Sequence, residues 1–160
     1  MRLLSNQIPR ASVRATLNYR LHPRVSVGVE YNPRADDVSP LVNLIAVTET
    51  EKRPSVIFTF SSDRIGTPYG YSYSATLSKD LSRQLRLPLA PYVGVSYGTY
   101  EDKLRPIGGL NINFTTWMGS TVMFDGRKVH PMLNFYKGRH GFTFLLAQGK
   151  NPGMTYSVSF

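Results

Sequence analysis

The chain has 160 residues and carries nineteen Lys and Arg against ten Asp and Glu, a formal net charge of +9. This length fits a single domain spanning residues 1–160, and the lack of cysteine excludes disulfides, thiolate metal sites and cysteine nucleophiles. The chain contains no run of about eighteen apolar residues, which excludes a membrane-spanning helix. Residues 1–7 lack the apolar core of a secretory signal, so an exported protein would be present here in mature form.

Apolar and polar residues alternate along most of the chain, which is the period-two pattern of β-strands. Single Gly and Pro residues separate these segments, as expected for many short elements. We expect roughly eleven strands and no helix. The expected strands are 11–21, 25–31, 41–50, 55–61, 69–78, 93–98, 110–115, 120–124, 129–135, 142–146 and 154–160.

An odd number of strands is unusual for a closed single-chain barrel, because bacterial barrels generally close with an even number. One explanation is a further strand before Ala11, somewhere between Leu3 and Pro9. The other is that the chain is cut from a longer one. An open edge along residues 11–21 would indicate truncation or closure by another chain.

The last segment alternates large apolar residues with small hydroxyl residues and ends on an aromatic residue. Met154, Tyr156, Val158 and Phe160 would share one face of a strand. This ending resembles the C-terminal insertion signal of bacterial outer-membrane β-barrels, with Tyr156, Val158 and Phe160 as its residues. The resemblance implies localisation in the bacterial outer membrane, contact with the lipid bilayer and recognition by the barrel-assembly machinery.

The polar face of the strands distinguishes a membrane barrel from a soluble one. In mid-strand it consists mainly of Ser, Thr, Asn and Gly, whereas a face in water normally carries many Lys and Glu. Aromatic residues also gather near strand ends, as in an interfacial girdle. We therefore expect an all-β fold, an antiparallel transmembrane up-and-down β-barrel of about 10–12 strands. The residues expected to face its lumen are Arg14, Arg20, Glu30, Asn111 and Asn113.

Every second connection between strands is rich in Lys and Arg. An up-and-down topology would bring these connections to one end, which would face the periplasm. This basic rim would comprise Arg24, Lys52, Arg53, Arg83, Arg86 and Arg139. Its positive potential would attract anionic lipid head groups or an acidic periplasmic protein. Nucleic acid is not an expected partner, because the basic residues are dispersed over turns.

A Gly-x-Ser-x-Gly motif, typical of a nucleophile elbow, is present at Gly94-Val95-Ser96-Tyr97-Gly98. Asp125 and His130 follow it in the order found in hydrolases. An elbow requires a strand, a strained turn and a helix, but Ser96 lies inside a period-two strand. We therefore predict no catalytic residue and no enzyme activity. We also predict no cofactor and no metal site, because the histidines are widely spaced and are expected as solvated turn residues. These histidines are His22, His130 and His140.

The function expected from these patterns is a small passive outer-membrane pore, in which Arg14 and Arg20 would favour anions. A non-conducting structural or docking barrel of an envelope complex is the first alternative. A soluble lipocalin-like binding barrel is the second.

Overall fold

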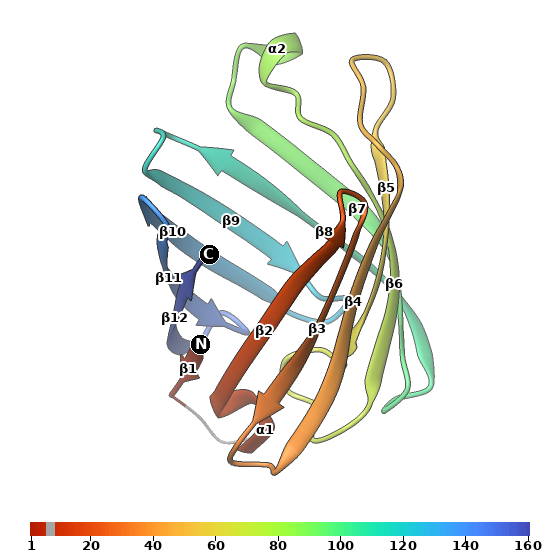
Figure 1. The fold of residues 1–160 in the computed structure, drawn as a ribbon, viewed down its shortest axis with the longest axis vertical. Helices are drawn as coiled ribbons and strands as arrows, with labels where there is room; N and C mark the ends of the chain where they lie inside the picture. Colours follow the sequence, from red (N-terminus) through yellow and green to blue (C-terminus); the bar gives the residue numbers. More distant parts are fainter. Residues whose placement is uncertain (6–8) are drawn as a thin grey trace.

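The computed structural model describes residues 1–5 and 9–160 and shows a closed antiparallel barrel of twelve strands (Figure 1). Each strand pairs with its neighbours in sequence, and β1 pairs with both β12 and β2. The strands are β1 (Arg2–Leu4), β2 (Val13–His22), β3 (Val25–Asn32), β4 (Asp37–Val47), β5 (Ser55–Ser62), β6 (Tyr71–Ser78), β7 (Leu89–Gly98), β8 (Lys103–Asn113), β9 (Met118–Phe124), β10 (Val129–Lys137), β11 (His140–Ala147) and β12 (Asn151–Val158). The expected all-β antiparallel barrel is confirmed.

The strand needed for an even count lies at the N-terminal end of the chain. Arg2 pairs with Thr155 of β12 and with Arg14 of β2, so β1 closes the sheet. Part of the interval predicted for this strand, residues 6–8, lies outside the described residues. The prediction that the next strand begins at Ala11 was wrong, because β2 begins at Val13 and follows the single-turn helix α1 (Pro9–Ser12).

The prediction that the chain has no helix was wrong in two places, α1 and α2 (Ser82–Leu85). Both are single turns. Pro9 is at the first position of α1, where a missing N–H costs nothing. α2 ends at Arg86 in the left-handed conformation, a C-cap. None of the helices in the described part of the chain is long and apolar enough to span a membrane.

The connections alternate between the two ends of the barrel. The connections after β2, β4, β6, β8 and β10 lie at one end, here named the rim end, and β12 also runs towards it. Those after β3, β5, β7, β9 and β11 lie at the opposite end, here named the plug end, near α1 (Figure 1). The loop expected at 32–40 is shorter than predicted, because residues 37–40 pair with residues 29–32 of β3.

Burial in this barrel is the inverse of that in a soluble protein. Among the described side chains, the buried hydrophobic ones are Leu4, Leu145 and Ala147, with Ile65 and Met132 packed against them. Large apolar side chains are instead exposed on the outer face of nearly every strand. The buried polar or charged residues are Arg2, Arg10, Ser12, Glu30, Asn32, Ser39, Ser55, Ser62, Thr67, His130 and Asn134. The outside of the wall is therefore apolar and its inside is polar.

Candidate functional site

The inner wall is held together by hydrogen bonds between inward side chains of neighbouring strands. Thr121 donates to Asn111 at 2.8 Å, and Asn134 donates to Thr121 at 3.0 Å. Thr143 in turn donates to the Asn134 oxygen at 2.8 Å. This series crosses β8, β9, β10 and β11 at one level of the barrel. The polar alternation seen in the sequence thus serves to satisfy donors and acceptors across strands.

Glu30 lies at the centre of a second inward cluster near the plug end. Its side chain is 2% exposed. One carboxylate oxygen accepts a hydrogen bond from the Arg14 guanidinium at 2.8 Å, and the other accepts from Ser62 and from the Asn32 amide. Three donors around one buried carboxylate compensate for the loss of its hydration.

The plug end of the lumen is filled by α1 and by the loop of residues 63–70 between β5 and β6. We call these two segments the plug. Arg10 of α1 is 4% exposed and donates to the carbonyl oxygens of Asp63 at 2.8 Å and Gly70 at 3.3 Å. Thr67, in the middle of the loop, is 1% exposed. Hydrogen bonds therefore tie the helix and the loop together inside the wall.

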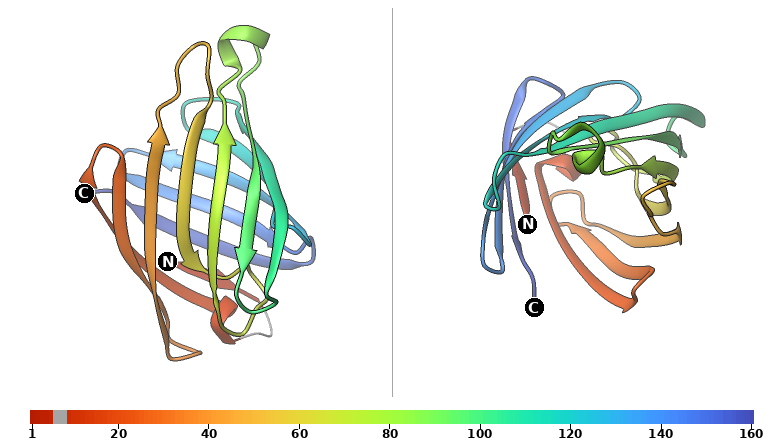
Figure 2. Two further views of the ribbon diagram at one scale, coloured as in Figure 1. Left: turned by 90° about the vertical axis from the view of Figure 1, so that its right-hand side faces the viewer. Right: turned by 90° about the horizontal axis from the view of Figure 1, so that it is seen from above.

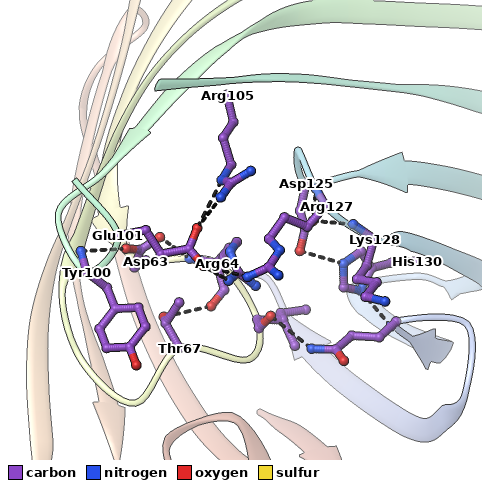
Figure 3. A network of polar contacts seen from close by, with 12 residues as sticks. Asp63, Arg64, Thr67, Tyr100, Glu101, Arg105, Asp125, Arg127, Lys128 and His130 are labelled. Carbon is purple, nitrogen blue, oxygen red and sulfur yellow. Dashed lines mark hydrogen bonds and ion pairs between the residues drawn. The ribbon is translucent and has the colours of Figure 1, made fainter. Parts of the chain in front are cut away.

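Glu101 joins the plug to the loops beside it (Figure 3). One oxygen accepts hydrogen bonds from Arg64 and Arg127 at 2.6 Å each, and the other accepts from Arg105 at 2.5 and 3.0 Å. Burial alone would raise the pKa of the Glu101 carboxyl, but the three guanidinium groups outweigh it and lower the pKa to about 2. This cluster links the loops after β5, β7 and β9.

Acid should loosen the Glu101 cluster only at very low pH. Because the folded pKa of about 2 lies below the ordinary value of 4.5, the cluster contributes its full stability above pH 4.5 and loses it as the pH falls towards 2. We expect proteolysis of the loop after β7 to accelerate over this interval with an acid-stable protease. Glu101→Gln should be cleaved rapidly already at neutral pH and show a flatter profile. Identical profiles for both proteins would contradict this prediction.

His130 and Asp125 form a further inward pair at the plug end. The Asp125-Gly126 turn predicted from the sequence is present, with Gly126 at φ +89°. The Nδ1 atom of His130 accepts the Gln148 backbone N–H at 3.1 Å, so Nε2 carries the proton and donates to Asp125 at 2.8 Å. Burial would raise the pKa of Asp125, but hydrogen bonds from His130 and the turn N–H groups lower it. His130 is 0% exposed, so its expected solvated position was wrong.

These contacts do not assemble a catalytic triad. Ser96 lies in the interior of β7 and shares a hydrogen bond of 2.6 Å with Ser72, while both ring nitrogens of His130 have other partners. Within the described ranges, no group of three or more His, Asp or Glu side chains could hold a metal ion. The arrangement supports structural roles for Asp125 and His130.

Above the plug the lumen contains a cavity of about 260 Å³. Its lining includes the hydroxyls of Ser72, Ser74 and Ser96 and the side chains of Arg14 and Tyr92. Inward residues nearer the rim end, such as Ser26 and Asn43, are half-buried rather than buried. The interior is therefore more accessible from the rim end than from the plug end.

The sequence-predicted lumen residues occupy different parts of the barrel. Arg14 and Glu30 meet at the plug end, and Asn111 belongs to the hydrogen-bonded series across β8 to β11. Arg20 and Asn113 are exposed near the rim end. The structure thus brings the first two together and separates them from the others.

The predicted basic residues all lie in rim-end connections, namely Arg24, Lys52, Arg53, Arg83, Arg86 and Arg139. A surface pocket of about 320 Å³ opens between the connections after β4 and β6. There Arg83 pairs with Glu51 at 2.8 Å and Lys79 pairs with Glu49 at 3.3 Å. Part of the positive charge is consequently neutralised within the rim itself.

Two of the C-terminal residues predicted as an insertion signal, Tyr156 and Val158, lie on the outer face of β12. The Tyr156 ring lies 5.0 Å from that of Phe142, and Val158 is 41% exposed. Phe160 lies beyond the end of β12 and is 98% exposed. The contacts of Tyr156 make it part of an outward aromatic cluster at the rim end.

Comparison of the chain with family models, with curated proteins and with solved structures finds no match. Sequence reasoning missed Arg10, Asp63, Arg64 and Glu101 as interior residues. They belong to segments without strand periodicity, and the available signal was only the density of opposite charges in the loops near residues 63 and 101.

Proposed function

We propose that this protein is a membrane-embedded β-barrel of the bacterial outer-membrane type. The proposal rests on the distribution of buried and exposed side chains, because an apolar outer wall and a polar, hydrogen-bonded interior suit a barrel surrounded by lipid. The outward side chains of Leu17, Phe58 and Tyr73 are 65%, 47% and 52% exposed, and such a surface in water would cause aggregation. The alternative of a soluble lipocalin-like barrel would need an apolar interior.

The positions of aromatic rings support the same proposal. Tyr69 and Tyr100 pack edge to face at 4.8 Å in the plug-end loops, and Trp117 stacks with Phe135 at 6.4 Å at the rim end. Aromatic side chains at both ends of a barrel fit the two interfaces of a bilayer, where ring and polar tip are both accommodated. The C-terminal signal would deliver the chain to the barrel-assembly machinery.

Within that class we propose a structural or docking barrel that does not conduct at rest. The proposal rests on the plug, since Arg10 of α1 and Thr67 of the loop are 4% and 1% exposed at the plug end of the barrel. A passive pore preferring anions is the second candidate, favoured by Arg14 beside the cavity and by the more accessible rim end. Conduction would then require displacement of the plug.

Conductance in planar bilayers tests the two candidates. The protein should fold into the bilayer and show no steady channel current. Arg10→Ala removes the hydrogen bonds from α1 to Asp63 and Gly70 and should produce intermittent current, because the plug is loosened. Arg83→Ala, an exposed ion-pair residue at the rim, is the matched control and should stay silent. Steady anion-selective current from the unaltered protein would favour the pore.

A further inference from the structure

The wall has one incompletely paired seam, between β2 and β12. β2 pairs with β3 from Ala15 to His22. On its other edge, only Val13 and Arg14 of β2 pair with β1. β12 pairs with β11 up to Val158. On its other edge it pairs with β1 only from Gly153 to Thr155, and two backbone hydrogen bonds with Met1 extend this contact to Tyr156. Figure 2 shows β2 and the C-terminal strand diverging on either side of the N-terminus.

Exposure of side chains agrees with this pairing. From Ala15 to His22 every residue of β2 is exposed, on the inward face as well as the outward face. By contrast, the inward residues Ser72, Ser74 and Thr76 of β6, which is paired along both edges, are half-buried. The seam therefore exposes the inner wall laterally, from the level of β1 to the rim end.

An open strand edge is costly in the proposed surroundings. Each backbone N–H or C=O without a partner in hydrocarbon costs several kcal/mol, which is why membrane barrels close. At the plug-end limit of the seam a strand already lies between the two edges, because Arg2 and Leu3 of β1 each pair with both β2 and β12. A single strand thus bridges the two edges, and β1 runs antiparallel to both.

The charged residues near the rim end of the seam indicate the chemistry of a segment that could bind there. Arg20 on β2 and Arg24 in the following turn flank one edge. Arg139, whose carbonyl oxygen accepts the Ser159 N–H at 2.9 Å, lies in the turn before β11, on the edge of β12 away from the seam. Across the described residues, none of these three arginines takes part in an ion pair. The seam is therefore open, extended and positively charged.

We propose that the seam is a docking site for an extended acidic segment of another protein, which adds one strand between β2 and β12 by β-augmentation. The segment runs in line with β1 and antiparallel to both edges. Its apolar side chains lie beside Leu17, Tyr19 and Leu21 on the outer face, and its acidic side chains lie beside Arg20 on the inner face. This inference rests on the proposed membrane embedding and names the partner chemistry of a docking barrel.

The test uses the full chain folded in detergent micelles and exploits its lack of cysteine. The probe is a synthetic peptide as long as the unpaired edge, with alternating valine and glutamate and with one central glutamate replaced by cysteine, so that its thiol faces inward at the level of Asn18. Asn18→Cys places a thiol at the seam, and Thr76→Cys places one on the fully paired strand β6. We expect disulfide cross-linking of the peptide to Asn18→Cys and none to Thr76→Cys.

Two altered peptides and one protein variant test the mode of binding. A peptide with proline in place of valine lacks the backbone N–H groups that point to one of the two edges and should not cross-link. A peptide with lysine in place of glutamate should be repelled. In the protein, Arg20→Gln with Arg24→Gln should weaken binding of the glutamate peptide about three- to ten-fold. The backbone amides of β2 that point towards the seam, and not those that pair with β3, should exchange hydrogen rapidly in the free protein and slowly with peptide bound.

Three outcomes would overturn the proposal. The first is equal labelling of both thiols, and the second is slow exchange, without peptide, of the β2 amides that point towards the seam. The third is formation of Asn18→Cys homodimers that exclude the peptide, which would assign the seam to a second copy. Heat-modifiable migration in gels, measured on the same samples, reports folding separately. Failure to fold in micelles would count against membrane embedding, whereas a folded barrel that ignores the peptide would count against the seam alone.

Discussion

Placing an arginine on the outer wall by Tyr73→Arg should destabilise the folded protein in lipid by about 2–4 kcal/mol. Tyr73 lies in the interior of β6, is 52% exposed and contacts the outward ring of Phe60 at 4.7 Å. A guanidinium there would have to enter the hydrocarbon or distort the bilayer around it. Urea titration of folding into phospholipid vesicles measures the free energy directly.

The neighbouring residue provides the control. Ser74 faces inward and borders the cavity of about 260 Å³, so Ser74→Arg leaves the charge in a polar space and should cost much less. The same contrast is expected on β3 between the outward Val27→Arg and the inward Ser26→Arg. The outward substitution Ile112→Arg should cost less than Val27→Arg, because β8 ends at Asn113 and a charge there reaches the interface. Equal sensitivity of both faces would contradict the lipid-facing assignment.

Removing the buried carboxylate of the plug end by Glu30→Ala should cost about 3 kcal/mol, since it leaves the Arg14 guanidinium inside the wall without its counter-charge. Ser62 and Asn32 lose their acceptor at the same time. Glu30→Gln keeps one carbonyl oxygen and should recover part of the loss. The measurement is the midpoint of urea unfolding at constant lipid concentration.

An exposed ion pair at the rim end provides the comparison for this prediction. Glu51 and Arg83 have side chains 79% and 81% exposed, so Glu51→Ala should change the free energy of unfolding by about 0–1 kcal/mol. A loss for Glu51→Ala as large as that for Glu30→Ala would mean that burial does not control the cost. The Glu30 cluster would then have no special importance for the stability of the wall.

The sequence by itself determined the fold class and the two faces of the wall. In the strand predicted at 69–78, alternating Tyr and Ser residues were enough to assign outward and inward sides, and Tyr73 and Ser74 lie accordingly. Such local inference works because the period of a strand is fixed by backbone geometry, whatever the strand pairs with. The strict alternation of connections likewise placed Arg24 and Arg139 at one end.

Only the tertiary structure decided what fills the lumen and where the wall is incomplete. The role of Arg10 depends on carbonyl oxygens 53 and 60 residues away, and Glu101 collects guanidinium groups from three separate segments. The seam depends on how far a strand of three residues extends between β2 and β12. Contacts between residues distant in sequence leave no periodic pattern, because closure of the barrel, rather than local backbone preference, brings them together.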